Sequence, residues 1–291
     1  MFHWLIVVIK NWIYRYPSLE TGILLRRYKR FFADIQLTSG EVITAHCPNT
    51  GPMTGVSTPG SLVKVSHSNN PKRKLLYTWE MIQVNDNQPT WVGVNTGLPN
   101  RVIKLALEQW LIPELASSYK KIRCEFPYGK EQKSRVDFLL TSEASEELAA
   151  ATLGMSALLQ SIEPFERPIY LEVKSVTLAQ GNVALFPDTV TTRGQKHLRE
   201  LMLLLPQARA VMLYFINRGD CTHFAPCDRA DLVYGQLLRE AVAQGVEVLP
   251  CRFEITPQEI RYLGLAEFLP VQPPAVSTPD SDSCSSLPHQ R

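Results

Sequence analysis

The sequence predicts a mixed α/β protein in which a small β-barrel is followed by a domain of layered strands and helices. From Gly22 to about Val94, short apolar runs alternate with turn residues, which is typical of a small barrel or sandwich such as the OB barrel. Beyond this region, strand-like runs alternate with runs of helical spacing, which indicates a mixed sheet covered by helices. The 291 residues are 45% hydrophobic and 20% charged, as in a globular protein of one large or two ordinary domains.

The barrel strands are predicted from apolar segments that end in turns. They are residues 31–37, 42–47, 62–66, 75–84 and 91–94. Residues 1–15 are predicted to be an N-terminal extension, and residues 16–95 the OB-like domain. The first apolar run ends at Lys10, which is too short for a membrane span, and it lacks the features of a signal peptide. We interpret it as the product of an upstream start codon, with an edge strand or a short helix as alternatives.

The second predicted domain, residues 96–269, begins with a helix. Its N-cap is predicted at Asn100, and apolar residues recur at helical spacing as far as Trp110. Further strands are predicted at 122–128, 134–140, 168–176, 210–216 and 246–255. Further helices are predicted after Thr191 or Thr192 and over 231–244. Residues 141–167 are predicted to be an insertion, and the Pro- and Ser-rich residues 270–291 a disordered tail.

Three charged residues lie inside two of these apolar strands. Glu172 and Lys174 point to the same face of one strand, because side chains alternate along a strand, and Asp137 joins them if the two strands pair. Charges inside a strand are costly unless they are paired or bound to a metal. We therefore predict that Asp137 and Glu172 bind Mg²⁺ or Mn²⁺, with Lys174 as the catalytic residue that orients or deprotonates water. The alternatives are a structural ion pair and the outward polar face of a half-exposed strand.

The helix that follows Thr191 carries further candidates for phosphate binding. Arg193 and Lys196 lie in its first turns, where a helix attracts anions, and Gln195 could position a nucleotide or a water molecule. His197 is interpreted as part of an ordinary polar helix face. Asp188 is either an additional metal ligand or a turn-forming residue that precedes the helix.

The barrel region carries the positive charge of the chain. Residues 16–75 contain eight Lys and Arg and three acidic residues, although the net charge of the whole chain is only +2. The predicted contacts to DNA phosphates are Arg26, Arg27, Lys29 and Arg30. The alternative is that these charges only keep the barrel in solution.

The six cysteines are scattered and form no Cys-x-x-Cys pair, so neither a disulfide framework nor a zinc site is predicted. Reduced, mostly buried thiols are typical of a cytoplasmic protein. We therefore expect a cytoplasmic location, which leaves association with the nucleoid open, and no membrane partner.

Several blocks of the sequence carry a resemblance to a known family. They are Arg27–Phe31, Ala45–Gly51, Tyr77–Glu80, Val92–Thr96, Ser134–Phe138, Glu172–Leu178, Phe186–Asp188 and Thr192–Leu198. In this order they resemble the sugar fermentation stimulation protein A family over about Tyr16 to Ile255. The N-terminal extension, the tail and a longer stretch between Asp137 and Glu172 depart from the family pattern. The longer stretch is compatible with the sheet only if it loops out.

The resemblance implies an OB-like domain followed by an αβ sandwich of the PD-(D/E)XK nuclease type. It carries Asp137, Glu172 and Lys174 over as the nuclease-type metal and catalytic positions. It also implies DNA binding and a link to the expression of sugar-utilisation genes in bacteria.

These observations predict a magnesium-dependent nuclease that hydrolyses phosphodiesters in DNA, with double-stranded DNA as the expected form. The alternative is a non-catalytic DNA-binding regulator of sugar-utilisation genes whose nuclease-type site is vestigial. A third hypothesis is an enzyme that acts on RNA or nucleotides, because both domains could accept RNA. The formation of a homodimer stays open, because the sequence shows no interface.

Overall fold

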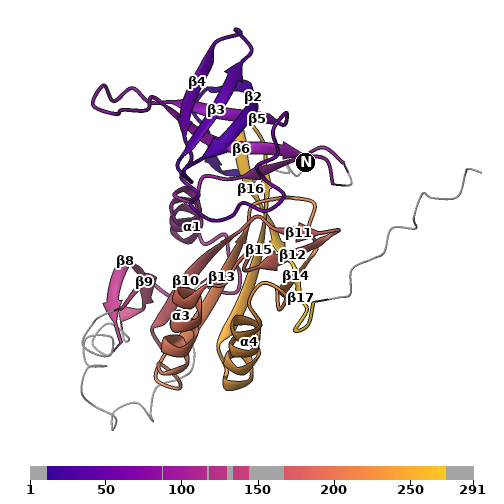
Figure 1. Ribbon diagram of the computed structural model, residues 1–291. Coiled ribbons are helices and arrows are strands. Elements are labelled where there is room, and N and C mark those ends of the chain that lie inside the picture. The colour runs from indigo at the N-terminus through magenta and orange to yellow at the C-terminus, as the bar shows by residue number, and fades with distance from the viewer. Residues whose placement is uncertain (1–11, 87, 117, 130–133, 144–166, 273–291) are drawn as a thin grey trace, which may run out of the picture.

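The computed structural model describes residues 12–86, 88–116, 118–129, 134–143 and 167–272. Figure 1 shows a β-barrel packed against one end of a larger, layered α/β domain. Most of the predicted insertion 141–167 and of the predicted tail 270–291 lies outside the described residues, as does most of the extension 1–15. Among the helices of the described ranges, none is long and apolar enough to cross a membrane.

The barrel is built from six strands. They are β2 (Leu19–Tyr28), β3 (Phe32–Leu37), β4 (Val42–His46), β5 (Leu62–His67), β6 (Tyr77–Val84) and β7 (Thr90–Gly93). They follow the order β4-β3-β2-β5-β6-β7, and a short parallel pairing of β4 with β6 closes the sheet on itself. Alternate residues point inward, and the barrel core contains Leu24, Ile35 and Trp79, each fully buried. The indole nitrogen of Trp79 donates to the Met81 carbonyl at 3.0 Å, which satisfies its polar group inside the core.

The second domain is centred on a seven-stranded sheet. Its strands are β1 (Trp12–Arg15), β8 (Lys121–Tyr128), β9 (Ser134–Thr141), β10 (Ile169–Val176), β13 (Arg209–Ile216), β15 (Glu247–Ile255) and β16 (Glu259–Leu265). The order is β1-β16-β15-β13-β10-β9-β8, with parallel pairing among β10, β13 and β15 and antiparallel pairing elsewhere. The last part of the predicted N-terminal extension, Trp12–Arg15, is thus an edge strand of this sheet.

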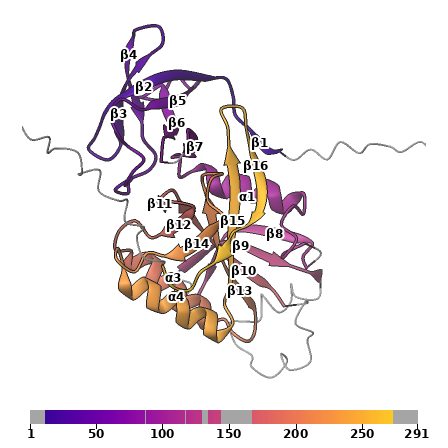
Figure 2. The ribbon, with the colours of Figure 1, turned by 90° about the vertical axis from the view of Figure 1, so that its right-hand side faces the viewer.

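Helices cover both faces of this sheet, as Figure 2 shows. One face packs against α1 (Leu98–Glu108), and the other packs against α3 (Thr192–Met202) and α4 (Leu232–Gln244). Thr191 caps α3 by accepting from the Gly194 N–H, as the sequence predicts, and Asp231 caps α4 in the same way. The two faces of β10 therefore lie in two separate cores, one beneath α1 and one beneath α3 and α4.

A small four-stranded sheet lies beside the main sheet. It contains β11 (Ala179–Gln180), β12 (Val183–Phe186), β14 (His223–Pro226) and β17 (Glu267–Phe268). The barrel is fixed to the second domain by the Gly93 N–H, which donates to the Asn217 carbonyl at 3.0 Å. A buried Arg218 guanidinium also reaches Asp86 of the barrel at 2.7 Å. The ends of β10 and β13 are therefore held close to the barrel.

Candidate functional site

Asp137 lies where β9 and β10 separate. The antiparallel pairing of these strands runs from Ile169 and Leu140 to Leu171 and Phe138, one residue short of Asp137. At this point the Asp137 Oδ2 accepts the backbone N–H of Val173 at 2.7 Å, in place of a strand-to-strand hydrogen bond. The carboxylate of Asp137 is therefore held in the fork between the strands, beside Glu172.

Asn100 orients the same carboxylate from the other side. Its Nδ2 donates to the Asp137 Oδ1 at 2.7 Å, so both oxygens of Asp137 accept a hydrogen bond. The prediction that Asn100 is the N-cap of the helix is wrong, because the cap is Gly97 and Asn100 lies in the first turn of α1. This position turns the side chain toward the sheet, a tertiary contact that the helical spacing alone does not indicate.

Glu172, Lys174 and His197 form a compact group on the α3 side of β10. The Lys174 Nζ lies 2.6 Å from the Glu172 Oε1 and 3.1 Å from the His197 Nδ1, and His197 also contacts Glu172. His197 is 5% exposed, so the interpretation of this residue as part of an ordinary polar helix face is wrong. His197 is thus brought into the site by the packing of α3 on the sheet.

Burial and neighbouring charges shift the two carboxylates in opposite directions. Burial, reinforced by the negative charge of Glu172, raises the pKa of Asp137 to about 6. Burial also acts to raise the pKa of Glu172, but the hydrogen bond from His197 and the positive charge of Lys174 outweigh it and lower that pKa. The pair therefore places a carboxylate with a lowered pKa next to one with a raised pKa.

One carboxylate oxygen of the group has no partner among the described residues. Glu172 is only 3% exposed, and its Oε2 is buried without a hydrogen-bond partner among the described residues. An unpartnered carboxylate oxygen is costly, and a bound cation would satisfy it. No cluster of three His, Cys, Asp or Glu suited to a metal occurs in the described part of the chain, so water and substrate would complete the shell. This donor set fits Mg²⁺, which usually binds one or two carboxylates and keeps several waters.

The polar residues at the start of α3 have different surroundings. The Gln195 Nε2 donates to both carboxylate oxygens of Asp231, at 3.1 and 3.0 Å, and so secures the start of α4 to α3. Lys196 is exposed and lies 3.5 Å from Glu200. Arg193 is exposed, and its Nε lies 3.4 Å from the His197 Nε2. Of the three candidates, Arg193 is the one that contacts a member of the group, His197, among the described residues.

The basic run of the barrel divides into one inward-facing arginine and three exposed residues. The Arg27 Nη2 donates to the carbonyls of Asn49 at 2.9 Å and Gly51 at 2.8 Å, and so holds the loop after β4. Arg26 pairs with Asp34 at 2.7 Å on the surface. Lys29 and Arg30 are exposed in the turn between β2 and β3, where both have positive φ angles. The surface of the turn is therefore the part of the run that is free to meet an anion.

We expect Arg27→Ala to lower the free energy of unfolding by about 2–3 kcal/mol, because charged hydrogen bonds to two loop carbonyls are lost. The measurement is the urea midpoint, with Arg30→Ala as a matched control whose exposed side chain should change stability by less than about 0.5 kcal/mol. Equal stability of the two variants would show that Arg27 does not hold the loop.

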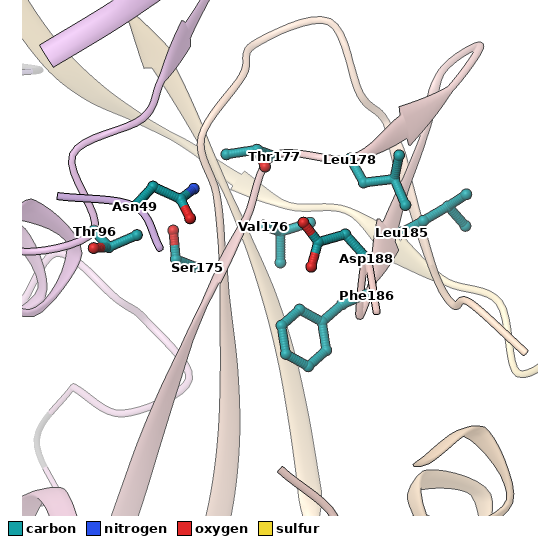
Figure 3. Close-up of a pocket in the computed structure, with 9 residues that line it drawn as sticks. All are labelled: Asn49, Thr96, Ser175, Val176, Thr177, Leu178, Leu185, Phe186 and Asp188. Atoms are coloured by element: carbon teal, nitrogen blue, oxygen red, sulfur yellow. The ribbon is translucent and has the colours of Figure 1, made fainter. Parts of the chain in front are cut away.

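Asp188 lies apart from the carboxylate group, at the junction of the two domains. It lines a pocket of about 80 Å³ with Asn49 of the barrel and Ser175 at the end of β10, as Figure 3 shows. Burial raises the pKa of Asp188. Hydrogen bonds from the backbone N–H groups of Asp188 and Met53, together with the charge of Arg27, lower it in part. No contact joins Asp188 to Glu172 or Lys174 among the residues that the structure describes. This position favours neither role predicted for Asp188, an additional ligand of the same metal or a simple turn-forming residue.

Comparisons with known proteins match both domains. The family described as "SfsA N-terminal OB domain" matches residues 25–94, and "Sugar fermentation stimulation protein RE domain" matches residues 97–259. The "Sugar fermentation stimulation protein homolog" of Cyanothece sp. is 67% identical over 259 residues, which are 89% of this chain and 99% of that protein. The homolog of Trichormus variabilis is 64% identical with the same coverage. The structure of Pyrococcus furiosus SfsA in complex with Ca²⁺ has a TM-score of 0.72 at 24% identity, covering 89% of this chain and 99% of that one.

Proposed function

The chain belongs to the sugar fermentation stimulation protein family, with an OB domain and a restriction-endonuclease-like domain, and we propose that it is a divalent-metal-dependent nuclease acting on DNA. The observation that carries the proposal is the buried, unpartnered Glu172 Oε2 beside Asp137, with the Lys174 ammonium next to both. The Pyrococcus furiosus protein has the same fold and was solved in complex with Ca²⁺, which supports the proposal that this chain also binds a divalent cation.

Each residue of the group has a part in this proposal. Asp137 and Glu172 would hold Mg²⁺ or Mn²⁺, which would polarise the phosphate and lower the pKa of a bound water. Lys174 would orient the attacking water and neutralise charge that develops on the phosphate. His197 contacts both Lys174 and Glu172 and would keep their side chains in one geometry. Asn100 and the Val173 N–H fix the orientation of Asp137.

DNA would reach this group across the surfaces of both domains. Lys29 and Arg30 expose their charges on the barrel, and Arg193 exposes its charge near the carboxylates. Phosphate contacts of this kind give affinity without sequence preference and weaken with added salt. The proposed partner is therefore DNA bound mainly through its backbone.

The proposal is tested with purified protein, Mg²⁺ or Mn²⁺, and linear, nicked, branched and single-stranded DNA, with RNA alongside. We expect metal-dependent cutting of DNA that Asp137→Ala abolishes while DNA binding is retained. Binding that falls with salt, without cutting of any substrate, would instead establish the non-catalytic regulator. Preferential cutting of RNA would replace DNA as the substrate.

A further inference from the structure

The pocket between the domains lies at the end of the strand that carries the carboxylate group. Its walls come from the barrel side through Asn49 and Thr96, and from the second domain through Ser175, Thr177, Phe186 and Asp188. Figure 3 shows Asn49 and Ser175 on one side of the pocket, with Asp188 and Phe186 on the other. A site formed by both domains at this position is available to a ligand that extends from one domain to the other.

Two polar groups of this pocket, the Thr177 hydroxyl and the Asp188 carboxylate, keep hydrogen-bonding capacity, because Asp188 accepts only from backbone N–H groups and a carboxylate has about four acceptor sites. Thr177 is only 8% exposed, and its hydroxyl makes no hydrogen bond to the described residues. Figure 3 shows this hydroxyl and the Asp188 carboxylate directed into the pocket. The positive charge that lowers the pKa of Asp188 is that of Arg27, whose Nη2 is already bonded to the loop carbonyls. The pocket therefore contains a carboxylate and a hydroxyl that can accept hydrogen bonds. A ligand with N–H donors would pair with them.

The remaining wall suits a flat ring. Phe186 is partly exposed and closes one side of the pocket, next to the apolar side chains of Val176 and Leu185. Unpaired bases are commonly bound by stacking on an aromatic side chain while polar groups read their hydrogen-bonding edge. An aromatic wall combined with a carboxylate and a hydroxyl has this composition.

The distance along β10 links this pocket to the proposed metal site. Ser175 directly follows Lys174 and lies three residues beyond Glu172, which is about 10 Å along a strand. That length is within the reach of neighbouring nucleotides in an extended single strand. A phosphate at Asp137 and Glu172 would therefore bring a nearby base of the same strand to the pocket.

We propose that the pocket lined by Asp188, Thr177 and Phe186 binds an unpaired nucleobase that carries an exocyclic amino group. The inference rests on the proposed function, because it places the base in the strand whose phosphate binds at Asp137 and Glu172. The Asp188 carboxylate accepts from the amino group, as acidic side chains do from the N4 of cytosine. The Thr177 hydroxyl bonds the neighbouring ring atom, and Phe186 stacks on the ring. Uracil carries a carbonyl in place of this amino group and would face the carboxylate with an acceptor.

The experiment compares oligonucleotides that differ in this one group. Fluorescence anisotropy measures the binding of labelled dC15 and dU15 to the Lys174→Met protein with Mg²⁺, so that binding is measured without cutting. We expect dC15 to bind about tenfold more tightly than dU15, which corresponds to one well-placed hydrogen-bonded contact. Asp188→Asn should remove most of this preference, because its amide can still accept from the Met53 N–H while presenting N–H donors to the base.

Thr177→Val provides a second variant that keeps the size of the side chain, and it should weaken binding of dC15 about fivefold. Thr141→Val is the matched control, since it also removes a buried, unpartnered hydroxyl but lies in β9 outside the pocket. Equal binding of dC15 and dU15, or a preference unchanged by Asp188→Asn, would overturn the inference. Metal-dependent cutting by the unmodified protein, measured in parallel, would in that case leave the proposed function standing. Failure to bind any oligonucleotide and failure to cut would overturn both.

Discussion

Replacing Lys174 with methionine should reduce the rate of metal-dependent DNA cutting by about a thousandfold, a size typical of losing a residue that acts on the proton and charge of the transition state. Methionine keeps a comparable apolar stem and removes the ammonium that lies 2.6 Å from the Glu172 Oε1. Single-turnover cleavage with saturating Mg²⁺ measures the effect on the chemical step. Binding of Mn²⁺, followed by calorimetry, should persist, because the ligands proposed for the metal are Asp137 and Glu172.

The same change at Lys120 is the matched control for this prediction. Lys120 is exposed and pairs with Glu143 at 3.0 Å, at the end of the β8–β9 hairpin opposite its turn. Its replacement removes the same positive charge from a position outside the site. We expect Lys120→Met to cut DNA within about twofold of the unmodified rate, since surface substitutions rarely disturb the structure. A rate for Lys174→Met that equals the rate for Lys120→Met would exclude Lys174 from the chemistry.

The grouping of Asp137, Glu172 and Lys174 could be predicted from the sequence because it rests on local geometry. The two-residue period of a strand places Glu172 and Lys174 on one face, and two apolar runs of similar length predict a pair of strands. The registration of those strands puts Asp137 next to Glu172 in the structure. What the period does not predict is the fork, in which the Asp137 side chain itself replaces a hydrogen bond between the strands.

Asn100 and His197 could not be assigned to the site from the sequence, because their roles depend on which face of the sheet each helix covers. Asn100 lies in a helix that packs on one face of β10, and His197 in a helix that packs on the other. Asn100 contacts Asp137 of β9 across 37 residues of sequence, and His197 contacts Glu172 of β10 across 25. Neither the helix propensity of a segment nor the spacing of its apolar residues indicates which strand a polar side chain will contact.

Arg27 shows the same limit for the basic run. Four cations within five residues suggest one phosphate-binding surface, yet β2 extends to Tyr28 and alternates its side chains between the two sides of the barrel wall. Arg27 consequently reaches the loop after β4, while Arg26 stays on the surface. Likewise, the pairing of Trp12–Arg15 with β16 joins segments almost a whole chain apart, which no local pattern indicates.

Replacing Asn100 with alanine should weaken Mn²⁺ binding by about 10- to 100-fold, although Asn100 is not itself proposed as a ligand. Hydrogen bonds that orient a metal-binding side chain commonly have an effect of this size. In the unmodified protein the Asn100 Nδ2 and the Val173 N–H hold one oxygen of Asp137 each, so the carboxylate has a single orientation. Without Asn100 the carboxylate would have to be ordered when the metal binds. Isothermal titration calorimetry at pH 7.5 measures the change, with Asn182→Ala in an exposed loop as the control.

The pH dependence separates this effect from a general loss of structure. Asp137 has a pKa of about 6 in the folded protein against 3.8 for the free side chain, so the folded state favours its protonated form. Its contribution to stability is therefore fully present below about pH 3.8 and is lost as the pH rises through about 6. Metal binding needs the ionised form, so affinity for Mn²⁺ should fall as the pH drops below about 6.

Asn100→Ala should move this fall in affinity to higher pH, because the hydrogen bond from Asn100 is one of the contacts that lower the pKa of Asp137. A purely structural role for Asn100 would reduce the thermal midpoint and leave the pH profile of Mn²⁺ binding where it was. A shifted profile with an unchanged thermal midpoint would instead assign Asn100 to the orientation and ionisation of Asp137. An affinity and a profile that both match Asn182→Ala would show that the Val173 N–H alone is sufficient to hold the carboxylate in the fork.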